Sequence, residues 1–134
     1  MKKMWFLIVL LAAAVVLAGC NPPKPSAKIT TAMFRDTELQ SGQSTDLILD
    51  AMNDGQVPVT TKFIITAENP DRVKITVQSP LEFTLQPGET MGNKIVKINA
   101  TTDTVSTSYL VTISLTDGAS TILDSKSLIL KVNR

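Results

Sequence analysis

Cys20 is the residue of this chain whose type and position most clearly imply chemistry. It is the single cysteine of the 134 residues, and it directly follows three aliphatic or small residues, Leu17, Ala18 and Gly19. Two lysines near the start of the chain and an uncharged run over positions 5–18 lie further upstream. A basic start, a short apolar core and small residues before a cleavage point are the features of a secretory signal peptide. Residues 1–19 are therefore predicted to be a leader that is removed.

The segment Leu17-Ala18-Gly19-Cys20 resembles the lipobox of prokaryotic lipoproteins. The resemblance implies that the Cys20 sulfur is acylated with diacylglycerol and that Cys20 becomes the first residue of the mature chain. Two or three acyl chains give stable attachment to a membrane, whereas one chain is marginal. The alternative is an uncleaved anchor, but a spanning helix needs about 20 apolar residues, and the run over positions 5–18 is shorter.

The lipobox resemblance also implies a location outside the cytoplasm. In a cell with two membranes, an aspartate after the cysteine typically signals retention in the inner membrane, and this chain has Asn21 there. We therefore expect delivery to the outer membrane in such a cell. In a cell with one membrane, the same anchor implies the outer face of the cell membrane.

The chain contains no histidine, which excludes several kinds of site. Ser-His-Asp and Cys-His nucleophilic catalysis both need an imidazole, as do His-based zinc and copper sites. Acidic residues near predicted turns could offer oxygen ligands to calcium: Asp50, Asp54, Asp71, Asp103 and Asp117. The spacing of a calcium loop is missing, however, and an aspartate in a turn usually stabilises the turn itself. We expect no metal, no cofactor and no catalytic residue.

Two further patterns suggest chemistry but have simpler interpretations. Glu82 and Glu89 could be imagined as the carboxylate pair of a hydrolase, but such a pair needs a substrate cleft between its members, and a small sandwich has little room for one. Asn99-Ala100-Thr101 matches the N-x-[ST] acceptor pattern for N-glycosylation. Asn99 is therefore a candidate glycosylation site, although such tripeptides are common by chance.

Composition excludes nucleic acid as a partner. Removing 19 leader residues from 134 leaves 115, and removing Lys2 and Lys3 leaves 11 basic side chains against 12 acidic ones. No run of like charge occurs, so a basic patch for nucleic acid or anionic lipid is not expected. The few aromatic side chains after the leader also argue against a carbohydrate-stacking platform: Phe34, Phe63, Phe83 and Tyr109.

The elements that would position these residues are short β-strands. Residues 20–27 comprise Cys20 and a proline-rich segment, which predicts an extended tether, and residues 28–134 form the domain. Period-two patterns and β-rich runs predict seven strands: Lys28–Arg35, Thr45–Met52, Thr60–Ala67, Arg72–Gln78, Lys94–Ala100, Ser108–Thr116 and Thr121–Val132. Asp117-Gly118 gives the best hairpin signal. About seven strands over roughly 100 residues are typical of an immunoglobulin-like antiparallel β-sandwich with Greek-key connections.

Turn and strand motifs of this region resemble prokaryotic immunoglobulin-like modules, including CARDB-type domains. The motifs are Asn53-Asp54-Gly55, the loop from Leu85 to Glu89, Tyr109, and the final strand Leu128 to Val132. The resemblance implies a spacer, adhesion module or accessory binding domain. A lone module has nothing to space, so we expect a lipid-anchored, non-enzymatic binding or adhesion module that contacts a protein or a cell-envelope polymer.

Two alternatives and one structural role remain open at this point. The chain could be an accessory subunit of a membrane-associated complex. It could also be a small protease inhibitor that uses Asn69-Pro70-Asp71 or the loop from Leu85 to Glu89. Tyr109 could face a ligand, but a strand-start tyrosine in a sandwich more often buries its ring and bonds its hydroxyl to backbone.

Overall fold

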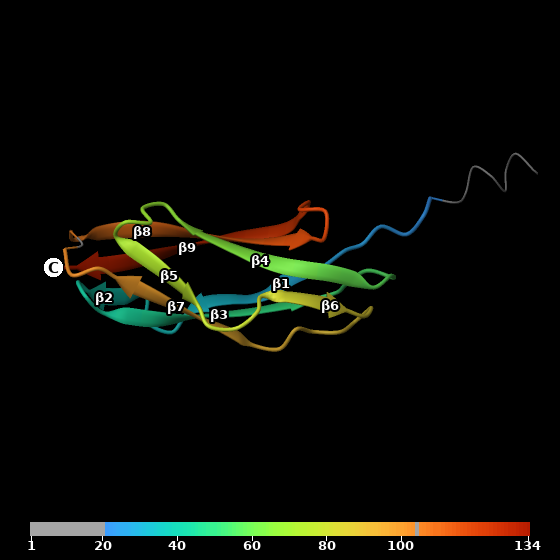
Figure 1. Ribbon diagram of the computed structural model, residues 1–134, viewed down its shortest axis with the longest axis horizontal. Coiled ribbons are helices and arrows are strands. Elements are labelled where there is room, and N and C mark those ends of the chain that lie inside the picture. Colours follow the sequence, from blue (N-terminus) through green and yellow to red (C-terminus); the bar gives the residue numbers. More distant parts are fainter. Residues whose placement is uncertain (1–20, 104) are drawn as a thin grey trace, which may run out of the picture.

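The computed structural model describes residues 21–103 and 105–134, so the predicted leader, Cys20 and the other residues of the predicted lipobox lie outside the described part. The described chain forms two β-sheets packed face to face, and its long axis runs along the strands (Figure 1). One sheet, here sheet A, has the strand order β1-β3-β7-β5, and the other, sheet B, has the order β2-β9-β8-β4-β6. The predicted all-β, immunoglobulin-like sandwich is confirmed.

All seven predicted strands are present, with ends that differ by one residue or not at all. Two short strands were not predicted, so the described residues contain nine in all: β1 Lys28–Phe34, β2 Glu38–Gln40, β3 Ser44–Met52, β4 Val59–Ala67, β5 Val73–Val77, β6 Glu82–Leu85, β7 Lys94–Ala100, β8 Thr107–Asp117 and β9 Ile122–Asn133. The additional strands are β2 and β6, which have three and four residues. Runs this short give too few alternations for a period-two pattern to be read.

One strand pair departs from the antiparallel arrangement that the sequence predicts. β2 runs parallel to β9, with Glu38 opposite Lys131 and Gln40 opposite Asn133. The reason is the short crossing from β1, which takes only the three residues between Phe34 and Glu38. β2 therefore keeps the direction of β1, and this direction is also that of β9.

The core lies between the sheets and consists of the alternate side chains of the long strands. Four side chains from each sheet face each other and have no exposed surface. They are Leu47, Leu49, Val96 and Ile98 of sheet A, and Val111, Ile113, Leu115 and Leu130 of sheet B. β5 follows the alternation only in part, because Val73 is buried whereas Val77 is 51% exposed. β5 is an edge strand, so its core-facing side chains are not covered along their whole length.

The predicted hairpin joins β8 and β9, and its loop differs in detail from the expectation for Asp-Gly. The residue with positive φ is Ser120, at 64°, and not Gly118. The Asp117 carboxylate explains this, because it accepts hydrogen bonds from the backbone N–H groups of Ala119 at 2.9 Å and Thr121 at 2.8 Å. An aspartate that caps the turn in this way shapes the loop without a left-handed glycine at the second position.

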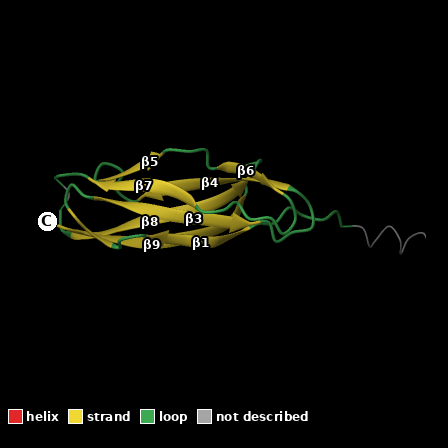
Figure 2. Cartoon of the chain, turned by 90° about the horizontal axis from the view of Figure 1, so that it is seen from below, coloured by secondary structure: helices red, strands yellow, loops and turns green. Residues whose placement is uncertain are grey.

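The sandwich has two distinct ends, which we call the tether end and the far end. The tether enters beside the β3–β4, β6–β7 and β8–β9 connections, and the C-terminus lies at the opposite, far end (Figures 1 and 2). The last tether residues are docked, since the Ser26 hydroxyl lies 2.7 Å from an Asp54 carboxylate oxygen and Ala27 is buried. A Cβ on Gly55 would come within 3.1 Å of the Ser26 backbone nitrogen, so glycine permits this close approach.

Candidate functional site

Tyr109 stands near the start of β8 with its ring in the core. It is 5% exposed, and its hydroxyl lies 3.4 Å from the backbone carbonyl oxygen of Val105, four residues upstream. Asn99 lies within β7 on the outer face of sheet A, and its side-chain amide donates to the Thr76 hydroxyl at 3.2 Å. Glycosylation of Asn99 and the role of Tyr109 stay predictions of the sequence.

The acidic residues near the turns have local partners. The carboxylate of Asp50 accepts the backbone N–H of Ala51, that of Asp117 accepts a backbone N–H group of its own hairpin, and that of Asp54 lies within hydrogen-bond distance of the Ser26 hydroxyl. Asp71 forms an ion pair with Lys74. Asp103 accepts a hydrogen bond from the Thr101 hydroxyl and forms an ion pair with Arg72. The hydrogen bond from the Thr101 hydroxyl is the main cause that lowers the pKa of the Asp103 carboxyl. Within residues 21–103 and 105–134, no three potential metal-ligating side chains gather at one place.

The two predicted inhibitor loops lie at opposite ends of the molecule. Asn69-Pro70-Asp71 belongs to the far end, whereas the loop from Leu85 to Glu89 lies at the tether end. The second loop is held by Asn53, whose side-chain amide donates to the carbonyl oxygens of Val57 at 2.8 Å and Leu85 at 2.9 Å. The structure thus joins the Asn53 turn to the Pro-Gly loop, two motifs that the sequence shows only as separate turns.

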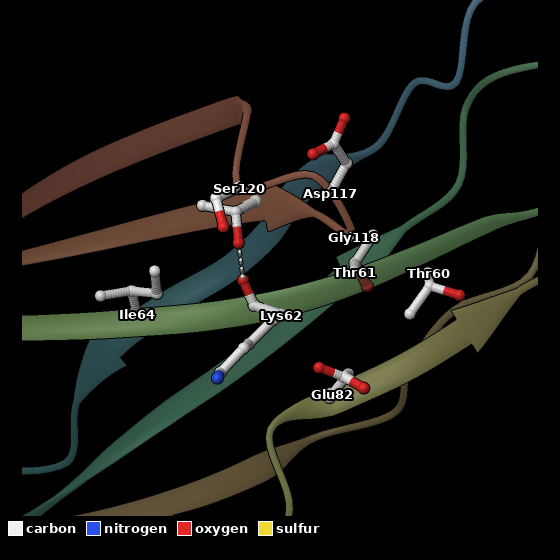
Figure 3. A pocket seen from close by; sticks show the side chains of 9 residues that line it. Thr60, Thr61, Lys62, Ile64, Glu82, Asp117, Gly118 and Ser120 are labelled. Atoms are coloured by element: carbon white, nitrogen blue, oxygen red, sulfur yellow. Dashed lines mark hydrogen bonds between the residues drawn. The ribbon is translucent and has the colours of Figure 1, made fainter.

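A shallow hollow of about 220 Å³ lies over the tether end of sheet B (Figure 3). Glu82, Lys62 and Thr116 are among the residues that line it, and the Thr116 hydroxyl donates to the Lys62 carbonyl oxygen at 3.2 Å. Glu89, the other half of the imagined hydrolytic pair, does not line the hollow, and its carboxylate accepts from the backbone N–H of Gln86 at 2.7 Å. The hollow therefore does not bring the two glutamates together.

The outer face of sheet A presents three aliphatic side chains in one cross-strand row. Met33 of β1 pairs with Ile48 of β3, and Ile48 pairs with Ile95 of β7. Paired residues of neighbouring strands project from the same face of a sheet. Met33 is 53% exposed and Ile95 is 47% exposed, while Ile48 between them is half-buried. We call these three residues the aliphatic row.

A charged row lies directly beside the aliphatic row. The carboxylate of Asp46 in β3 forms two ion pairs. One is with the guanidinium of Arg35 in β1 at 2.9 Å, and the other is with the ammonium of Lys97 in β7 at 3.1 Å. Two positive groups on one carboxylate leave this row, here the ionic row, with a net positive charge. The shared Asp46 carboxylate is largely buried, with 14% of its side chain exposed, whereas the Arg35 and Lys97 side chains are 59% and 40% exposed.

The sequence contains the signal for this surface, but only in part. Ile48 and Ile95 stand at positions of their strands that face away from the core, which an alternation pattern can reveal. Their alignment with Met33 depends on the strand order and on the register, and the bulge between Ile29 and Thr31 sets the register of β1. Neither follows from the sequence alone.

No family model and no curated protein sequence matches this chain. Several solved structures resemble it in fold, and three of them are described here. The first is alpha-2-macroglobulin from Escherichia coli, spanning domain MG7 to the C-terminus, with 18% identity and a TM-score of 0.60 over 81% of this chain and 17% of that one. The second is the sporulation control protein Spo0M from Bacillus subtilis, with 14% identity and a TM-score of 0.58 over 81% of this chain and 50% of that one.

The third structure is the CARDB domain of a Pyrococcus furiosus protein, with 18% identity and a TM-score of 0.49 over 83% of this chain and 94% of that one. At such identities a similarity concerns the fold alone. The chain spans about a sixth of the macroglobulin fragment and half of Spo0M.

Proposed function

We propose that this protein is a lipid-anchored, non-enzymatic binding module outside the cytoplasm, and that it holds a protein partner through the outer face of sheet A. The aliphatic row is the observation that supports this proposal. Single exposed apolar side chains are common on protein surfaces, whereas adjoining ones point to an interaction site. Met33, Ile48 and Ile95 adjoin one another across three strands.

A protein fits this face better than a cell-envelope polymer. Binding of sugar rings usually relies on exposed aromatic side chains, but Phe34, Phe63 and Tyr109 are buried and Phe83 is half-buried with Lys94 above its ring. The net positive ionic row favours a partner surface that presents a carboxylate next to aliphatic side chains. Charges of this kind mainly increase the rate of association and set the orientation of the partner.

The tether supports the anchored part of the proposal. Asn21 to Pro25 are exposed and lie outside any strand, and the chain becomes part of the sandwich at Ser26 and Ala27. None of the described segments is a helix long and apolar enough to cross a membrane. Acylation of Cys20 would supply the attachment and would hold the module at a high effective concentration near a membrane-associated partner.

The test is chemical crosslinking of intact cells that express the full chain, followed by capture and mass spectrometry. The variants Met33→Lys and Ile95→Lys place a charge in the aliphatic row. The control variant Ile64→Lys places the same charge on the outer face of sheet B, at an isoleucine that is 42% exposed. We expect the first two to reduce the recovered partner at least about tenfold, as for residues central to an interface, and the third to leave it unchanged.

The outcomes separate the candidate functions. One protein recovered in near-equal amount would make the module an accessory subunit of that complex. Recovery of wall polymer alone would favour adhesion to the envelope and contradict the proposed protein partner. Equal recovery with Ile95→Lys and Ile64→Lys would exclude sheet A as the contact face.

A further inference from the structure

β9 has a long backbone edge that is only partly covered. The strand runs over 12 residues, from Ile122 to Asn133, and β8 pairs with it on one side over residues 122–132. On its other side, β2 pairs with residues 131–133 only. In the part of the chain that the structure describes, no strand pairs with residues 122–130 on that side, although β1 of sheet A lies close to β9. An unpaired edge is a template for an added strand.

The hydrogen bonds to β2 show which backbone groups face this edge. The backbone N–H of Lys131 donates to the carbonyl oxygen of Thr37 at 2.9 Å. The carbonyl oxygen of Asn133 accepts from the backbone N–H of Ser41 at 2.8 Å. In an antiparallel pair, successive residues point their backbone groups alternately toward and away from the partner strand. The N–H and C=O groups of Ser127 and Ile129 therefore point away from β8, in line with the groups that β2 already binds.

One carboxylate closes the edge at its other end. Asp124 accepts the backbone N–H of Ser125 through Oδ1 and that of Ile29 in β1 through Oδ2, both at 2.8 Å. This contact links the edges of the two sheets, and β1 and β9 lie on the same side of the sandwich (Figure 2). The open stretch is therefore bounded by Asp124 on one side and by β2 on the other, with Ser127 and Ile129 at its centre.

The side chains along this stretch favour a particular kind of guest. Ile129 is 63% exposed and is paired with Leu110 of β8, which is 40% exposed. Lys126 is exposed and has no ion-pair partner among the described residues. A strand beside β9 would gain apolar contact next to Ile129 on one face. On the other face it would gain a charge partner next to Lys126.

We propose that this edge accepts an extended peptide segment of a partner protein, which adds to sheet B beside Ser127 and Ile129 in line with β2. The segment has an aliphatic residue that packs against Ile129 and an acidic residue that pairs with Lys126. Main-chain hydrogen bonds hold such a guest, and the alternate side chains select it. The proposal concerns the opposite sheet from the aliphatic row and does not depend on it.

The test uses proline at position 127. Because the Ser127 N–H points away from β8, Ser127→Pro removes an edge donor without removing a hydrogen bond of the β8–β9 ladder, and proline is tolerated at such edge positions. Ser127→Ala is the matched control, since it keeps the N–H group. The full acylated chain in detergent micelles is used to select linear peptides from a random displayed library, with empty micelles as the counter-selection.

We expect enriched peptides to contain an acidic and an aliphatic residue three positions apart, because Lys126 and Ile129 lie three positions apart on opposite faces. Their Kd should rise at least tenfold with Ser127→Pro and less than twofold with Ser127→Ala. The peptide should also slow hydrogen exchange at Ser127 and Ile129. Lys126→Glu, which leaves the backbone intact, should weaken the same peptides at least tenfold, and it takes over the test if the proline variant does not fold.

Several results would overturn the proposal. These are a library that yields no peptide above the empty micelles, peptides that bind both position-127 variants equally, or unchanged binding by Lys126→Glu. Ile95→Lys should leave peptide binding unaltered, so failure here is distinguishable from failure of the sheet A interface.

Discussion

Asn53 shows how a residue of ordinary turn type can become a central structural contact. Its side chain has no exposed surface, yet its polar atoms are satisfied. The amide donates to Val57 and Leu85, and its oxygen accepts from the backbone N–H of Gly55 at 2.9 Å. A buried polar group is stable only when it is hydrogen-bonded. Asn53 therefore fixes the β3–β4 turn and the loop after β6 in a single arrangement.

Replacement of Asn53 by alanine tests this role. Asn53→Ala leaves the Val57 and Leu85 carbonyl groups without their donor, and we expect the free energy of unfolding to fall by about 2 to 4 kcal/mol. Urea denaturation followed by circular dichroism measures the change. Asn93→Ala, at an exposed position after β6, is the control and should change stability by less than about 0.5 kcal/mol. Equal effects of the two substitutions would contradict the role assigned to Asn53.

At the scale of the elements, strand alternation predicts the long strands because each buries one face. β3 and β8 follow the rule over nearly their whole length, and their ends are therefore predicted to within a residue. β2 and β6 are set by long-range pairing with β9 and β4, which a local pattern does not contain. The Asp117-Gly118 hairpin is predictable only in part. Its position follows from the sequence, but the residue with positive φ depends on the hydrogen bonds that the Asp117 carboxylate accepts within the loop.

The contact of Asp124 gives a prediction at this scale, because it joins strands of different sheets. Asp124→Ala removes the acceptor of two edge N–H groups, those of Ile29 and Ser125. We expect the free energy of unfolding to fall by about 1 to 3 kcal/mol and hydrogen exchange to accelerate at both amides. Asp36→Ala, at an exposed position between β1 and β2, serves as the control. Unchanged exchange at Ile29 would show that the two edges are not coupled through Asp124.

At the scale of the whole molecule, the proposed membrane anchor depends on the Cys20 thiol. If Cys20 is acylated, Cys20→Ser should move the protein from the detergent phase to the aqueous phase in a phase-separation assay, or leave the leader uncleaved. The physical reason is the loss of acyl chains, each CH₂ of which contributes about 0.8 kcal/mol to membrane binding. Ser26→Ala alters the tether without altering the thiol and should stay in the detergent phase. Unchanged partitioning of Cys20→Ser would contradict the anchor.

The candidate surfaces could be predicted less well than the fold. The absence of histidine and the single cysteine exclude many kinds of site from the sequence alone. The aliphatic row and the open edge of β9 involve residues from strands far apart in the chain, such as Met33 with Ile95 and Lys131 with Glu38. Their proximity follows from the order of strands in each sheet, which several topologies with the same strand pattern would change.

That order also determines when the chain can begin to fold. Among the described strands, seven of the eight connections cross from one sheet to the other, and the β8–β9 hairpin is the single local pairing. The last strand, β9, pairs with β8 and β2 and reaches β1 through Asp124. Folds dominated by such distant pairings form slowly. If residues 1–19 direct export as proposed, this slow formation of distant pairings would help to keep the polypeptide unfolded while it passes through a translocation channel.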